Sequence, residues 1–225
     1  MSIVDALDRA CGRFDEIRAS LRWADFAKST LGHAENRAGD ELRAASFVAV
    51  MGAVEQYFRE FVDWINEQIG SSGVHHSQIR LALHSIAAAD DFRSLQDLRD
   101  VEKVFNKRAL LLERTADATP CVLSPRYDEM GLAGETIRPK QVGYIWRVYG
   151  LPGSGFGDVH QQLALRVFAD NRNDYAHGKV ELADFLQNPE CDIKSILRRI
   201  DDIEDWLFYC WDAGSDYLSN SSFYR

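Results

Sequence analysis

The clearest pattern of apolar and polar positions in the chain lies between Asp40 and Ile69. Apolar residues recur there at spacings of three and four, which places them on one face of an α-helix. These residues are Phe47, Met51, Val54, Phe58, Phe61, Ile65 and Ile69. A second apolar row lies beside them and consists of Val50, Tyr57 and Trp64. We therefore predict a long helix that buries more than one face, as a central bundle helix does, and that ends at Gly70.

A second long helix is predicted near the C-terminus. Its apolar positions show the same three-four spacing, and they are Ile193, Ile196, Ile200, Ile203, Leu207 and Cys210. Pro189 lies upstream and should prevent the helix from extending further in that direction. Asp192 has the side chain of a helix N-cap.

Other segments have less regular patterns. Residues 2–30 predict an N-terminal helix, and 77–113 predicts two helices broken near "AAADD". Prolines and glycines without a sustained period predict a long surface loop at 114–137 and a second loop at 151–158. Because no convincing strand alternation occurs, we expect residues 1–225 to form a single all-α domain, a helical bundle with two long central and C-terminal helices and long connecting loops.

Composition narrows the classes of function. With 225 residues, of which 46% are hydrophobic, the chain is large enough for a substantial core. Its formal charge of -9 argues against a basic surface that binds nucleic acid non-specifically. No apolar run approaches the roughly 18 residues of a membrane span. We expect a cytoplasmic protein without membrane contact.

Neither a cofactor nor a metal is predicted. The four cysteines are far apart, without a CxxC pair, and are expected to be reduced thiols: Cys11, Cys121, Cys191 and Cys210. His75, His76 and His84 lie close in sequence but lack a cysteine or acidic partner at ligand spacing. A solvated loop and helix start is the expected environment of these histidines.

The segment from residue 137 to residue 157 contains no Asp or Glu, although the chain is acidic. Its basic residues are interleaved with aromatic ones, a mixture that neutralises phosphates and stacks bases. The candidate RNA-binding residues are Arg138, Lys140, Arg147, Tyr144 and Trp146. The alternative is a short structural helix that turns Tyr144, Ile145 and Val148 inward and leaves Arg147 in solvent.

The stretch "DNRNDYAHGKV" contains the candidate chemistry. A helix from about Asp158 would reach His177 in its last turn, and Gly178 is typical of the position after a helix. A histidine is favoured electrostatically at that end without any catalytic role. Arg172 and Asn173, however, lie within a turn and a half of His177. They add a planar guanidinium and an amide to the one side chain that titrates near neutrality. Phosphodiester cleavage uses groups of these kinds.

The residues "RNDYAHG" resemble the Arg-x4-6-His signature of the HEPN superfamily (higher eukaryotes and prokaryotes nucleotide-binding). Far upstream, "VMGAVEQYFREFV" is similar to an early helix of that family with a Glu-x-Tyr/Phe pattern, here Glu55 to Tyr57. The resemblance covers about 40–215. It is closest to stand-alone HEPN ribonucleases of bacterial toxin and defence systems.

The resemblance implies a metal-independent endoribonuclease that acts as a homodimer, with two Arg-His motifs facing each other. Helix geometry agrees with a composite site, because residues five apart point roughly 140° from each other. One His177 would act as general base on the RNA 2′-hydroxyl, and its symmetry mate as general acid. Arg172 would stabilise charge on the phosphoryl oxygens, and Asn173 would orient a phosphate or a neighbouring side chain.

Departures from the family pattern keep alternatives open. In HEPN toxins paired with a nucleotidyltransferase antitoxin, a modified tyrosine commonly follows the histidine by two residues, and here that position is Lys179. Tyr175 inside the motif remains an alternative acceptor. Glu55 either supports the site or is a polar residue on the helix flank. An alternative function is a non-catalytic HEPN-like binding or scaffolding module, and an antitoxin or defence-system partner is expected for the toxin.

Overall fold

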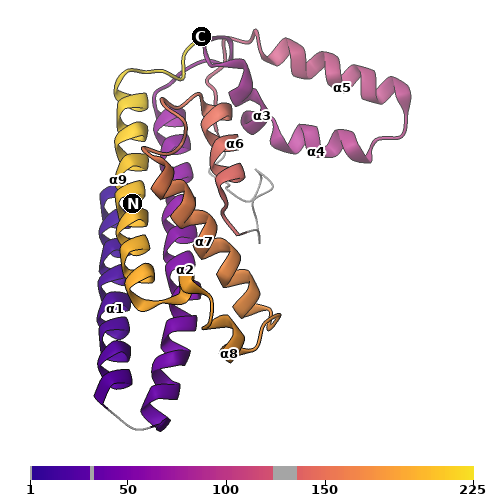
Figure 1. The fold of residues 1–225 in the computed structure, drawn as a ribbon. Coiled ribbons are helices and arrows are strands. Elements are labelled where there is room, and N and C mark those ends of the chain that lie inside the picture. The colour runs from indigo at the N-terminus through magenta and orange to yellow at the C-terminus, as the bar shows by residue number, and fades with distance from the viewer. Residues whose placement is uncertain (1, 31–32, 124–135) are drawn as a thin grey trace.

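Four long helices form the body of the part of the chain that the structure describes. The computed structural model describes residues 2–30, 33–123 and 136–225. Figure 1 shows α1 (Ile3–Thr30), α2 (His33–Ser71) and α9 (Ile193–Ser219) running along one another, with α7 (Val159–Ala176) crossing beside them. Contacts join α2 to α1, α7 and α9, and they join α9 to α1 and α7. The central position predicted for α2 is therefore confirmed.

Shorter elements complete the chain. Over the described ranges, the remaining α-helices are α3 (His84–Ala87), α4 (Ala89–Asp97), α5 (Val101–Arg114), α6 (Pro139–Tyr149) and α8 (Leu182–Phe185). Short 3-10 helices occupy His76–Gln78, Leu81–Leu83 and Pro189–Cys191. Among the described residues, extended pairing is limited to the isolated bridges His75–Pro120 and Ile79–Tyr224. The all-α prediction is confirmed.

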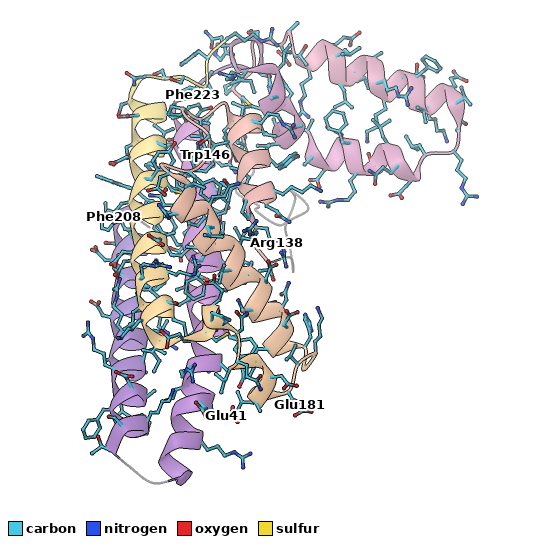
Figure 2. All side chains as sticks on the ribbon, viewed as in Figure 1. Glu41, Arg138, Trp146, Glu181, Phe208 and Phe223 are labelled. Atoms are coloured by element: carbon cyan, nitrogen blue, oxygen red, sulfur yellow. The ribbon has the colours of Figure 1, made fainter. Side chains whose placement is uncertain are left out.

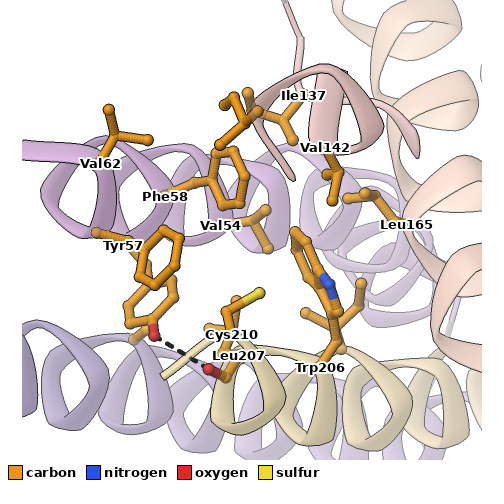
Figure 3. Close-up of a cluster of buried hydrophobic side chains, with 14 of the residues drawn as sticks. Val54, Tyr57, Phe58, Val62, Ile137, Val142, Leu165, Trp206, Leu207 and Cys210 are labelled. Atoms are coloured by element: carbon orange, nitrogen blue, oxygen red, sulfur yellow. Dashed lines mark hydrogen bonds between the residues drawn. The ribbon is translucent and has the colours of Figure 1, made fainter. Parts of the chain in front are cut away.

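Both predicted apolar rows of α2 lie in the core, apart from the half-buried Trp64. The six apolar residues named in α9 are also buried. Figure 3 shows Phe58, Val54, Trp206 and Cys210 on the two facing helices, where the Tyr57 hydroxyl donates to the carbonyl oxygen of Leu207 over 3.0 Å. Burial of large apolar side chains from helices this distant in sequence is the main source of the bundle's stability.

The ends of α2 differ from the prediction. The helix begins seven residues before Asp40 and passes through Gly39, where a Cβ would lie 3.3 Å from the carbonyl oxygen of Ala24. Glycine at this position lets α1 and α2 approach closely. Gly70 does not end the helix, because α2 continues to Ser71 and the left-handed glycine is Gly73, with φ 71°.

The predicted starts of α7 and α9 are confirmed. Asp192 caps α9 by accepting from the backbone N–H of Lys194 over 3.1 Å. Asp158 caps α7 in the same way. At its other end, α7 has His177 as C-cap, followed by Gly178 at φ 60°.

The segment 77–113 has more breaks than predicted. The break near "AAADD" is present, because Ala88 leaves helical geometry between α3 and α4. A further break precedes α5, where the Asp100 side chain accepts from two backbone N–H groups of the next turn. Helices α4 and α5 form a hairpin that projects away from the bundle (Figure 1).

The two predicted loops have different outcomes. Residues 115–123 contain no helix, but most of the loop predicted at 114–137 lies outside the described residues. The loop at 151–158 is present and contains two left-handed glycines, Gly153 and Gly155. The carbonyl oxygen of Gly155 accepts from the indole of Trp206 over 2.8 Å, which attaches this loop to the core.

Candidate functional site at the end of α7

Arg172 and Asn173 form a hydrogen-bonded cluster with Thr136, three residues before α6. Arg172 Nη1 donates to Thr136 Oγ1 and to Asn173 Oδ1, each over 3.0 Å. The Thr136 hydroxyl lies 3.0 Å from Asn173 Oδ1 and can donate to it. All three side chains are half-buried. Sequence reasoning missed Thr136, because a single threonine in a loop gives no motif signal.

Glu55 joins the cluster from α2. Burial raises the pKa of this carboxyl group, while the positive charge of Arg172 and the backbone N–H of Ile137 act in the opposite direction. Its Oε1 atom is buried without a hydrogen-bond partner among the described residues. Glu55 and Arg172 act on each other through their charges, without a hydrogen bond or ion pair between them.

The structure does not bring His177 into this cluster. As the C-cap of α7, His177 has an exposed side chain that makes no hydrogen bond or ion pair with the described part of the chain. Its backbone N–H donates to the carbonyl of Asn173 over 3.2 Å. Within one chain, Arg172 is hydrogen-bonded to Thr136 just before α6, whereas the imidazole of His177 faces solvent.

The predicted basic residues of the segment 137–157 lie along α6. Figure 2 shows Arg138 between the start of α6 and α7, where it forms an ion pair with Asp170. Lys140 is exposed close by, and Arg147 lies exposed at the far end, with its guanidinium carbon 6.0 Å from the centre of the Tyr144 ring. Thus α6 presents positive charge from the motif toward the opposite end of the bundle.

Trp146 is wrongly predicted as a base-stacking residue. Its side chain is only 4% exposed, its ring stacks on Phe61, and its indole N–H donates to the Pro152 carbonyl. It is a core residue. The structural interpretation of this segment is confirmed for Ile145 and Val148, which are buried. That interpretation is wrong about Tyr144, which is 39% exposed and not turned inward.

Tyr175 and Lys179 have partners around the motif. The Tyr175 hydroxyl donates to Glu41 Oε2 of α2 over 3.0 Å, and its ring packs on Phe185 of α8. Burial raises the pKa of Tyr175, and the Glu41 carboxylate raises it further. Lys179 Nζ lies 3.6 Å from Asp174. Tyr175 therefore braces the C-terminal part of α7 against α2.

The described residues contain no candidate metal centre. No group of three or more His, Cys, Asp or Glu side chains has suitable geometry there. His76 and His84, expected in solvent, are instead buried and stacked, with ring centroids 5.6 Å apart. Within the described ranges, no helix has the length and apolarity to cross a bilayer.

The chain was compared with known protein families, sequences and structures. Family models, curated proteins and solved structures all give no match to this chain.

Proposed function

We propose that the chain is a HEPN-type, metal-independent endoribonuclease, a toxin or defence effector whose active site is shared by two copies. The proposal rests on one observation: within one chain, the arginine and the histidine of the motif lie in different surroundings. Arg172 is hydrogen-bonded to Thr136 and Asn173, whereas the exposed His177 side chain makes no hydrogen bond or ion pair with the described residues. A two-fold contact at the end of α7 would bring two half-sites together.

The chemistry requires no group beyond RNA and these side chains. One His177 takes the proton of the 2′-hydroxyl as its oxygen attacks phosphorus. The bond from phosphorus to the 5′-oxygen then breaks, and the partner's His177 protonates that oxygen. Arg172 stabilises the negative charge that develops on the phosphoryl oxygens. The products are a 2′,3′-cyclic phosphate and a 5′-hydroxyl.

The hydrogen bonds around Arg172 support its assignment to charge stabilisation. Its guanidinium is held in one orientation before substrate arrives, so less reorganisation is needed during the reaction. Glu55 is a positioning residue, because it acts on Arg172 from α2. In this proposal the exposed Lys140 and Arg138, which is ion-paired with Asp170, bind the phosphates of RNA that lies on the motif.

A cleavage assay on defined RNA tests the proposal. The chain should cut RNA in EDTA, leave DNA of the same sequence intact and produce cyclic phosphate ends. His177→Ala should lower the rate by roughly 10²- to 10⁴-fold, the usual contribution of acid–base catalysis. His160→Ala is the matched control, because His160 is an exposed histidine at the other end of the same helix. A requirement for magnesium, equal cutting of DNA, or 5′-phosphate ends would show that the assignment is wrong.

Expression in cells distinguishes this function from a non-catalytic binding or scaffolding module. The intact chain should be toxic, and His177→Ala should relieve the toxicity at equal protein level and equal thermal stability. The same assay provides a selection for the antitoxin or defence-system partner that we propose. Toxicity that persists in the His177 variant would favour the binding module, a function also consistent with the apolar side chains on the projecting hairpin.

A further inference from the structure

Helix α5 carries large apolar side chains that no other described part of the chain covers. Neither α4 nor α5 contains a buried residue, and the hairpin extends away from the bundle (Figure 1). On α5, Val101, Phe105 and Leu112 are 70%, 64% and 72% exposed. Isolated exposed apolar residues are common, but a group of this kind on one element typically marks an interaction surface.

These residues form one stripe along α5. Together with the exposed Arg108, they follow one another at spacings of four, three and four, so they project within about 60° of one another on a helix. Alternating steps of three and four are the spacing of the seam between two coiled helices. Val104 and Leu111, which are partly covered, lie to one side of the stripe. The stripe is therefore an apolar surface of α5 that remains exposed when α5 packs on α4.

The order of residues in the stripe is self-complementary when two copies of α5 run antiparallel. A two-fold axis between residues 106 and 107 places Val101 against the partner's Leu112. The same axis places Phe105 against the partner's Arg108, where a guanidinium can lie on an aromatic ring. A parallel pair would instead place the two Arg108 side chains against each other, and like charges repel.

Charge on the hairpin also fits a second copy. Helix α4 contains three acidic residues and one basic residue, whereas α5 contains four basic residues and two acidic ones. Arg99 and Asp100 between them cancel, so residues 89–114 are neutral in a chain with a net charge of -9. Two copies that meet here keep their acidic bodies apart, and each α5 brings a net positive charge that the acidic α4 of its own hairpin offsets. The hairpin as a whole lacks the net positive charge that nucleic acid binding requires, although the stripe contains Arg108.

The geometry points to an isologous contact in which α5 pairs antiparallel with α5 of a second copy of this chain. One helix pair buries less than the roughly 1,200 Å² that stable complexes typically need, so the contact is weak and depends on concentration. It is separate from the end of α7. The inference stands whether or not the chain cleaves RNA.

Disulfide cross-linking tests the direction of the pair. In a Cys11→Ser background, which removes the one cysteine that is not fully buried, Val101→Cys and Leu112→Cys are introduced together. The two positions are about 16 Å apart along one helix, too far to bridge within a chain. Oxidation should give a covalent dimer, whereas Val101→Cys alone should remain uncross-linked. A double variant that stays monomeric, or a single variant that cross-links equally well, overturns the proposal.

Sedimentation measures the strength of the same contact. Leu112→Glu should weaken self-association by about tenfold or more, because it places a charge in the seam. Leu81→Glu is the matched control, since Leu81 is a 66% exposed leucine outside the hairpin. Equal association of Leu112→Glu and the unmodified chain would contradict the pairing, as would an equal decrease in the control. Cross-linking should persist in His177→Ala, which separates this inference from the proposed ribonuclease.

Discussion

The guanidinium of Arg172 donates to the hydroxyl of Thr136 over 3.0 Å, which joins α7 to the residues just before α6. The same hydroxyl lies 3.0 Å from the side-chain oxygen of Asn173. A single threonine thus orients both residues that begin the motif. Because Thr136 lies 36 positions from Arg172, its role depends entirely on the packing of α6 and α7.

Thr136→Val should lower the rate of RNA cleavage with little effect on folding. The substitution keeps the shape of the side chain but removes the acceptor of Arg172, a hydrogen bond to a charged group worth roughly 1.5–3 kcal/mol. Thr136→Ser keeps the hydroxyl and should retain most of the activity. Single-turnover rates of the two variants, measured beside their melting temperatures, provide the check. Equal rates would show that Thr136 does not position Arg172.

Arg172→Ala should reduce transition-state stabilisation by roughly 2–4 kcal/mol, as removal of an oxyanion donor does. RNA affinity and oligomeric mass should change little. Arg172→Lys should recover only part of that stabilisation, because an ammonium preserves the charge beside Glu55 but not the planar fork. Comparison of kcat and KM for both variants separates catalysis from binding. A change confined to KM would assign Arg172 to substrate binding.

The positive charge along α6 should contribute to RNA binding. Replacement of Arg138, Lys140 and Arg147 with glutamine should weaken binding and flatten its salt dependence, by roughly 0.7 in the log–log slope for each single-strand phosphate that is no longer neutralised. A matched triple replacement on the exposed side of α1 removes the same charge far from the motif, at Arg13, Arg22 and Lys28. Binding measured over a series of salt concentrations decides the point. Equal slopes in the two variants would place the RNA elsewhere.

Substitutions of Trp146 and Tyr144 should differ in their effect on the free energy of unfolding. Trp146→Ala should lower the free energy of unfolding by roughly 3–5 kcal/mol, because a large core side chain is removed. Tyr144→Ala should change that free energy by less than about 1 kcal/mol, since the ring is partly exposed. Denaturant titration measures both values. A small effect of Trp146→Ala would contradict its assignment to the core.

Acid should destabilise the protein through His76 and His84. Burial lowers the pKa of both histidines below the ordinary value of 6.5, and the nearby Arg114 lowers them further. A lowered pKa in the folded state favours the neutral ring. The resulting stability is therefore present above about pH 6.5 and is lost as the pH falls through the folded-state pKa. Arg225 and the other histidine also lower the pKa of His84, whereas Asp117 raises that of His76.

Unfolding measured at neutral and acidic pH tests this dependence. The decrease in stability on acidification should be smaller in His84→Asn, because that side chain does not titrate. His160→Asn, an exposed position, should keep the pH dependence of the unmodified chain. An unchanged pH dependence in His84→Asn would contradict the assignment.

Much of the fold could be predicted from local patterns. The three-four spacing in α2 and α9 identified their buried faces, and Asp158 and Asp192 identified the starts of α7 and α9. These features depend on helix periodicity and on backbone N–H groups within one turn, so neighbouring residues determine them. The ends of α2 were less predictable. Whether a helix continues through Gly39 or Gly70 depends on the close approach of α1 and on packing beyond the helix itself.

The sequence by itself determined the helical periods, the caps and the chemical types in the motif, because each depends on residues within a few positions of one another. Only the tertiary structure decided which side chains meet. It placed Thr136 against Arg172, left His177 exposed and buried Trp146. Those outcomes follow from how α2, α6 and α7 pack. Side chains far apart in the chain come together only when burial of the apolar faces fixes the helices against one another.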